Sequence, residues 1–159
     1  MSDAVLVLTI ATALGAGIIG GAFYAFSAFI MAALGRIHSA EGIRAMQEIN
    51  VTVLTPWFMV PLFGTGIACL ALIVVSAADW DGSYSPFLVA ASALYLVGCL
   101  GVTMALNVPR NNVLTKLEPA RPESDEVWRA YLTEWTRWNS VRTGASLAAL
   151  ALLIVAAAA

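Results

Sequence analysis

Residues 128–159 read WRAYLTEWTRWNSVRTGASLAALALLIVAAAA and join a polar, tryptophan-rich half to an apolar half. No proline interrupts the segment, so all of it can form one helix. At about 100° per residue, aromatic and polar side chains share one face of that helix. This face carries Trp128, Leu132, Trp135, Asn139, Arg142 and Ser146, flanked by Tyr131 and Trp138. The segment predicts a helix that begins amphipathic, ends in a membrane, and turns an asparagine and an arginine inward.

The composition of the whole chain is that of a membrane protein. Of 159 residues, 60% are hydrophobic and 11% are charged, with a mean hydropathy of +0.84. A helix needs about 20 apolar residues to cross a bilayer. We expect spans at approximately 5–34, 54–78, 86–108 and 140–158, within one domain covering 1–159. The predicted fold class is all-α: a four-helix transmembrane bundle, up-and-down, with a cytoplasmic amphipathic extension before the fourth span.

Local signals predict where the other helices begin and end. Pro109 lacks a backbone donor and predicts the end of the third span near Val108, where asparagine side chains could satisfy the last carbonyl groups. Ser124 can cap the last helix, whose first turn is acidic. Residues 41–48 predict a short helix between the first two spans.

The basic residues predict an orientation. All eight lysine and arginine residues lie in two connections: Arg36 and Arg44 after the first span, and the other six between the third span and the apolar part of the fourth. The remaining connection holds only Asp79 and Asp81. By the positive-inside rule, the basic connections are cytoplasmic and both termini lie outside. We therefore expect a multi-pass protein of the cell membrane, inner or plasma.

Metal and redox centres have few candidate ligands. His38 is the one histidine, so one chain cannot build a multi-histidine metal site or a bis-histidine haem. Cys69 and Cys99 stand singly in apolar spans. We predict no metal and no cofactor. The expected partners are the lipid bilayer and a hydrophobic small molecule, with no nucleic acid, and Gly17 and Gly21 offer a face for a homo-oligomer.

Up-and-down topology brings the inner ends of all four spans together, so their polar residues can form one site. The candidates for substrate binding are Tyr24, Ser27, Asn50, Asn107, Asn111, Trp135, Trp138 and Asn139. Arg142 should point into the bundle with a partner such as Glu48, Asn50 or Asn107. The alternative is structural, with tryptophans as interfacial anchors, Arg142 reaching the surface and asparagines as helix caps.

Three motifs resemble a known family. They are FSAFIMAAL at 26–34, NVPRNNVL at 107–114, and W-x-x-Y-x-x-x-W-x-x-W-N-x-V-R-T at 128–143. The chain resembles the anthrone-oxygenase-like family of small four-span membrane proteins, long catalogued as a domain of unknown function. This resemblance implies a four-helix membrane bundle and, from its fungal polyketide-pathway members, oxidation of anthrones to anthraquinones without an evident metal or flavin. Ser140 departs from the pattern, because many bacterial members carry histidine there.

The resemblance suggests roles for the candidate residues. As catalytic residues, His38 or Glu48 would remove a proton from the substrate, and Arg142 would stabilise the resulting enolate. Trp135, Trp138 and Tyr24 would stack on a flat ring system. Two other functions remain open: a non-enzymatic membrane protein that binds or moves a small apolar ligand, and a structural or partner subunit. A coupled transporter is disfavoured, because residues 4–34 and 51–78 contain no acidic residue within the first two spans.

Overall fold

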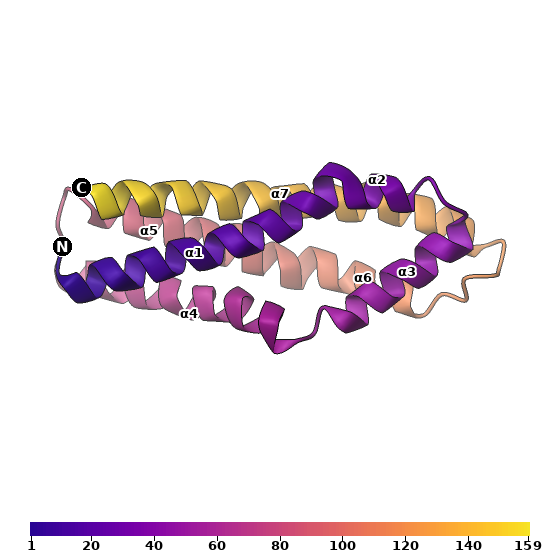
Figure 1. Ribbon diagram of the computed structural model, residues 1–159, viewed down its shortest axis with the longest axis horizontal. Helices are drawn as coiled ribbons and strands as arrows, with labels where there is room; N and C mark the ends of the chain where they lie inside the picture. Colours follow the sequence, from indigo (N-terminus) through magenta and orange to yellow (C-terminus); the bar gives the residue numbers. More distant parts are fainter.

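Four long apolar helices run side by side along the molecule in the computed structural model, which describes residues 1–159 (Figure 1). They span Asp3–Leu34, Pro56–Ala78, Ser85–Thr115 and Ser124–Ala158, and each is long and apolar enough to cross a membrane. The predicted all-α, four-helix membrane bundle is therefore confirmed. The structure contains no β-strand.

Two of these helices, the first and the third, carry more than one label in Figure 1 because π-helical turns interrupt them. The first consists of α1 (Asp3–Ala25), a π turn (Phe26–Ile30) and α2 (Met31–Leu34). The third consists of α5 (Ser85–Ala93), two π segments (Leu94–Gly101 and Thr103–Asn107) and α6 (Val108–Thr115). The second and fourth are α4 (Pro56–Ala78) and α7 (Ser124–Ala158), and the shorter α3 (Ser39–Thr52) joins α2 to α4.

The chain runs up and down, so its connections gather at two ends. Both termini and the turn after α4 lie at one end, whereas α2, α3 and the connection from α6 to α7 lie at the other (Figure 1). Helix α1 packs against α7 and α4, and α5 packs against the same two helices. The two basic connections thus share one end of the bundle. That this end faces the cytoplasm stays a prediction from the positive-inside rule.

Two apolar cores follow each other along the bundle. The larger one fills the end near the termini and includes Phe23, Leu62 and Tyr95. The smaller one lies at the basic end and includes Met46, Trp128 and Trp135. The 35 residues of α7 reach about 52 Å at 1.5 Å per residue, well beyond a hydrocarbon core of about 30 Å. Helix α7 is therefore longer than a bilayer is thick, so part of it extends beyond the hydrocarbon core.

Glycine permits close helix approach at two points in these cores. A Cβ atom on Gly20 of α1 would lie 2.9 Å from Cδ2 of Leu147 on α7. A Cβ on Gly42 would lie 2.8 Å from Cζ2 of Trp128 and 2.9 Å from the Leu34 carbonyl oxygen. Gly17 faces Leu150 within the chain, while Gly21 is exposed with nothing within 4 Å of such a Cβ. A homo-oligomer through this face stays a prediction.

Two helix ends differ from those that the sequence predicts. The third helix does not end near Pro109 but continues to Thr115, because π-helical turns precede the proline and the Arg110 side chain donates to the Leu106 carbonyl over 2.7 Å. The asparagines there do not cap the helix. Ser124 is the first residue of α7 rather than its cap, and its hydroxyl donates to the Glu118 carbonyl over 2.8 Å.

Candidate functional site

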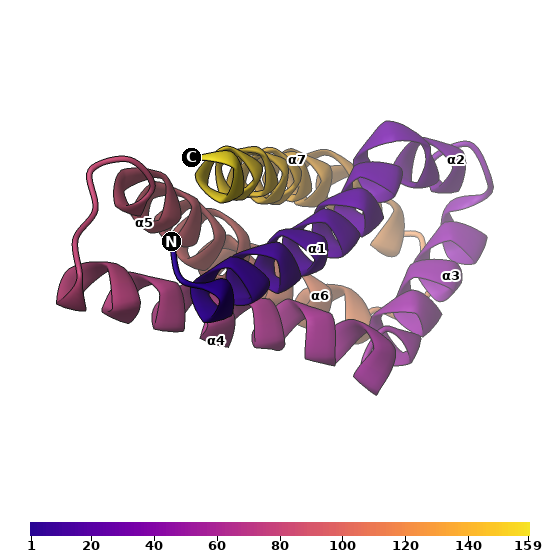
Figure 2. The same ribbon diagram turned by 60° about the vertical axis from the view of Figure 1, so that its left-hand side comes forward.

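A cavity of about 120 Å³ lies where the two apolar cores meet. Every long helix contributes to its wall, and α3 closes one side; Figure 2 shows α3 crossing the end of the bundle from α2 to α4. Most of the lining is apolar or aromatic. The lining residues are Ala22, Phe23, Phe26, Met46, Ile49, Asn50, Val53, Phe58, Met59, Leu62, Thr103, Val108, Asn111, Trp135 and Arg142. Such a mostly apolar cavity with a few polar groups is typical of a small-molecule site.

Arg142 is the one charged residue in this wall. Only 4% of its surface is exposed, and its Cζ atom lies 3.9 Å from the centroid of the Phe23 ring and 5.2 Å from that of Trp135. Its Nη2 donates to Oδ1 of Asn139 over 2.7 Å, and its Nη1 donates to Oγ1 of Thr103 over 3.3 Å. The two ion pairs of the protein, Arg110–Glu134 and Arg121–Glu118, do not involve it.

A buried guanidinium without a carboxylate is energetically unfavourable. Removing an ion from water costs several kcal/mol even after relaxation, and an opposite charge usually offsets part of that cost. Neutral acceptors and two aromatic faces replace the opposite charge here. None of the partners that the sequence suggested, Glu48, Asn50 or Asn107, bonds to Arg142. The field of the cation is consequently available to a bound molecule.

Asn139 connects the first and last spans at this point. Its Nδ2 donates to the Phe23 carbonyl and to Oγ of Ser27, each over 2.7 Å, while its Oδ1 accepts from Arg142. The Ser27 hydroxyl also lies 3.0 Å from the hydroxyl of Ser140. Asn139 is completely buried. It thereby fixes the guanidinium relative to the π turn that follows α1.

The asparagines of the NVPRNN segment connect the third helix to α7. Asn111 Oδ1 accepts from Nε1 of Trp135 over 2.7 Å and from the Tyr131 hydroxyl over 2.9 Å. Asn107 Nδ2 donates to the Trp135 carbonyl over 3.2 Å. Trp128, Tyr131 and Trp135 stack in sequence along α7. These contacts hold the indole of Trp135 as a fixed wall of the cavity.

Other residues proposed from the sequence lie outside the cavity wall. His38 is exposed and caps α3, where its Nδ1 accepts from the Ala40 amide over 3.3 Å, and Glu48 is exposed on α3. Tyr24 is 59% exposed, and Trp138 is half-buried under Arg137. Ser27 and Asn107 do not border the cavity, but Ser27 bonds to Asn139 and Asn107 bonds to the Trp135 carbonyl. The structure therefore brings together Asn50, Asn111, Trp135 and Arg142 in the wall, supported by Ser27, Asn107 and Asn139.

Sequence reasoning missed the residues that face Arg142 from the other helices. Phe23 provides the closest aromatic face, and Thr103 provides an acceptor that also donates to the Cys99 carbonyl over 2.7 Å. The spacing of Thr103 and Asn107, one turn apart, is a weak signal of a shared face. The apolar lining from α3 and α4, such as Met46 and Phe58, carries no signal in sequence, because only packing decides which apolar side chains border a cavity.

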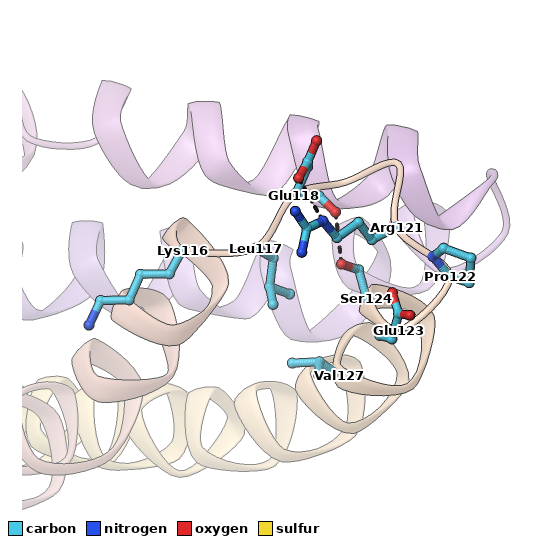
Figure 3. A pocket seen from close by; sticks show the side chains of 8 residues that line it. All are labelled: Lys116, Leu117, Glu118, Arg121, Pro122, Glu123, Ser124 and Val127. Carbon is cyan, nitrogen blue, oxygen red and sulfur yellow. Dashed lines mark hydrogen bonds and ion pairs between the residues drawn. The ribbon is translucent and has the colours of Figure 1, made fainter.

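A larger hollow of about 720 Å³ lies over the connection between α6 and α7 (Figure 3). Its lining carries both signs of charge, and Arg121 pairs with Glu118 over 2.7 Å. Lys116 extends away from this pair in Figure 3. The hollow is a surface feature of the connection's own charged residues, so the cavity at Arg142 is the better candidate site.

Comparison with known proteins assigns the family. No curated protein and no solved structure matches the chain. The sequence pattern of one protein family, anthrone oxygenase, matches residues 54–152. That range contains Thr103, Asn111, Trp135, Asn139 and Arg142, and it ends before the last turns of α7. Because the match covers more than half of the sequence, this multi-pass membrane protein belongs to the anthrone oxygenase family.

Proposed function

We propose that the protein is a membrane-embedded oxidoreductase that oxidises a hydrophobic aromatic small molecule with O₂ at the cavity beside Arg142, at the cytoplasmic end of the bundle. One observation carries the proposal: a guanidinium that is 4% exposed and has no carboxylate partner borders an aromatic cavity. A cation preorganised in a site of low dielectric stabilises negative charge as it develops on a substrate. Membership of the anthrone oxygenase family supports the choice of reaction.

The chemistry needs no redox group from the protein. Loss of a proton from the CH₂ group of an anthrone to water gives an enolate whose charge is shared between the ring carbon and the carbonyl oxygen. Arg142 would stabilise that oxygen, and the carbon would add O₂ and take up a proton to give a hydroperoxide. Loss of water from the hydroperoxide leaves a second carbonyl group. One oxygen atom stays on the carbon, and the other leaves in water with the remaining CH₂ hydrogen and the proton that the hydroperoxide took up.

The size of the cavity restricts how a substrate is accommodated. Sites for drug-sized ligands have about 300–1,000 Å³, whereas this cavity has about 120 Å³. A single aromatic ring fits, but a three-ring anthrone requires the cavity to widen. Such widening would move helix α3 and would break the hydrogen bonds that its Gln47 side chain donates to the Leu114 and Leu117 carbonyls over 2.9 and 3.1 Å. We propose that α3 shifts outward when a three-ring substrate binds.

A second function is favoured by the same small volume. The protein could bind or move a one-ring apolar ligand without oxidising it, and the aromatic lining suits such a ligand. A purely structural role has less support, because it needs Arg142 to anchor at a membrane surface and Arg142 is instead buried. Trp57, which is 90% exposed, and Trp80, which is 61% exposed, are better candidates for interfacial anchors.

Aerobic oxidation of an anthrone tests the proposal. The purified protein in lipid nanodiscs should form anthraquinone with uptake of one O₂ per molecule, faster than empty nanodiscs. Arg142→Met should slow the reaction by about 100-fold or more, as removal of an oxyanion-stabilising donor does. Arg129→Met, on the exposed side of the same helix, serves as the control. If the protein oxidises the anthrone no faster than empty nanodiscs, the oxidase proposal fails; equal rates in Arg142→Met would exclude a role for this cation.

A further inference from the structure

The two buried side-chain polar atoms of the cavity wall that lack a hydrogen-bond partner are both N–H donors. Arg142 Nε and Asn50 Nδ2 are buried and have no hydrogen-bond partner. Asn111 uses its oxygen twice, for Trp135 and Tyr131, and its amide nitrogen donates to no protein group. Thr103 is fully engaged, since it accepts from Arg142 and donates to Cys99. A buried acceptor without a partner, Asn107 Oδ1, belongs to a residue outside the cavity wall.

No side chain in the wall can act as an anion or take up a proton at neutral pH. The lining contains no aspartate, glutamate or histidine. The wall is therefore a cation with additional donors and no compensating base. Buried donors of this kind cost about 1–3 kcal/mol each when unpaired, so a ligand that accepts from them gains affinity over one that does not.

We propose that this site selects its aromatic ligand as the oxygen anion, a phenolate or enolate, over the neutral phenol or ketone. This inference deepens the proposed function, on whose choice of site it rests. By losing its own proton, the ligand supplies the negative charge that pairs with Arg142. The oxyanion lies beside the guanidinium, and a second acceptor on the ring faces the Asn50 and Asn111 amides.

The groups that surround Arg142 on every side are neutral, which supports selection of an anionic ligand. The first helix presents Phe23, α3 presents Met46, Ile49 and Asn50, and α4 presents Phe58, Met59 and Leu62. Among titratable groups, only Cys99 on the third helix and Tyr131 on α7 interact with the arginine. Thiols and phenols are ordinarily neutral at pH 7. The acidic residues of α3, Glu41 and Glu48, are exposed on its outer side.

The ligand 4-nitrophenol provides a direct probe. Its phenolate absorbs visible light and its phenol does not, so absorbance reports the ionisation of the bound molecule. It has one ring, which suits a cavity close to the roughly 150 Å³ that holds benzene in other proteins. Its nitro group supplies the second acceptor. The experiment titrates 4-nitrophenol with pH in nanodiscs that contain the protein, in empty nanodiscs, and in nanodiscs that contain the variants.

The expected result is a saturable fall in the pKa of bound 4-nitrophenol by about one to three pH units, the effect of a nearby opposite charge. Binding of the phenolate is then at least tenfold tighter than that of the phenol. Arg142→Met should abolish the shift. Arg137→Met should retain it, because Arg137 is exposed on the same helix and controls for surface charge that merely attracts anions.

Two results would overturn the inference: no saturable shift with the parent protein, or the same shift in Arg142→Met. Circular dichroism and thermal unfolding of both variants confirm that each is folded before the titration is interpreted. The outcome is separable from the oxidase assay. A pKa shift of 4-nitrophenol without oxidation of an anthrone would support the anion site and reject the oxidase. Oxidation of an anthrone without a pKa shift would support the oxidase and reject the anion site.

Discussion

Arg142 donates from Nη2 to Oδ1 of Asn139 over 2.7 Å, so a buried guanidinium takes its closest acceptor from a neutral amide one turn earlier on the same helix. The amide cannot cancel the charge as a carboxylate would. It fixes the guanidinium over the Phe23 ring, because the same asparagine donates to the Phe23 carbonyl over 2.7 Å. Burial of the cation thus lowers the free energy of unfolding. Its positive charge stays uncancelled and acts on any molecule in the cavity.

Arg142→Met should leave the folded protein as stable as the parent or more stable. Removing the buried charge recovers a desolvation cost of several kcal/mol, and the lost hydrogen bonds to Asn139 and Thr103 offset only part of that gain. Thermal unfolding in nanodiscs measures this. A variant that loses activity but keeps or raises its unfolding temperature assigns the arginine to function, while a variant that fails to fold would make it structural.

Arg142 and Asn139 should be energetically coupled. Asn139→Leu alone removes the acceptor of a buried charge and should destabilise strongly, while Asn139→Leu combined with Arg142→Met should cost less than the sum of the two changes. Coupled contacts show interaction energies of about 0.5–3 kcal/mol. Unfolding free energies of the parent, both single variants and the double variant complete the cycle. Strict additivity would contradict the geometry at 2.7 Å.

Met46→Ala should widen the cavity and favour larger ligands. Met46 is 1% exposed and borders the cavity, whereas Ile43, one turn earlier on α3, is completely buried in the same core but does not border it. Both changes to alanine should destabilise, by about 2–5 kcal/mol as core truncations do. Only Met46→Ala should raise the affinity for a three-ring anthrone relative to 4-nitrophenol. An equal rise in Ile43→Ala would indicate general loosening of α3.

Gly42→Ala should weaken the packing of α3 against α7. The added methyl would meet the Trp128 ring at 2.8 Å and the Leu34 carbonyl at 2.9 Å, and overpacking of this kind costs about 1–3 kcal/mol. Gly64→Ala in α4 is the matched control, because nothing lies within 4 Å of its added methyl. The unfolding temperature should fall for the first variant and hold for the second. A fall of equal size in both would implicate glycine flexibility instead of packing.

The site shows where sequence reasoning reaches its limit. The helical period of 128–146 identified the inward face, and Trp135, Asn139 and Arg142 are all buried on it. Leu132, also assigned to that face, is only half-buried, and Tyr131 is buried in its place. Residues close together on one helix obey its period. His38 and Glu48 lie at the same end of the bundle but outside the cavity. The topology predicts the end at which a residue lies, but it does not predict the direction of its side chain.

The apolar runs and the distribution of charge determined that this protein is a membrane bundle of four helices whose two basic connections share one end, since burial of apolar surface and the length of a span depend on composition alone. Tertiary structure decided the rest. The π turns carry the third helix past Pro109, Phe23 and Thr103 meet Arg142 from other helices, and α3 closes a cavity of about 120 Å³. Contacts between segments far apart in the chain depend on the relative rotation and offset of helices. Packing of all the side chains together sets these quantities, and no local pattern encodes them.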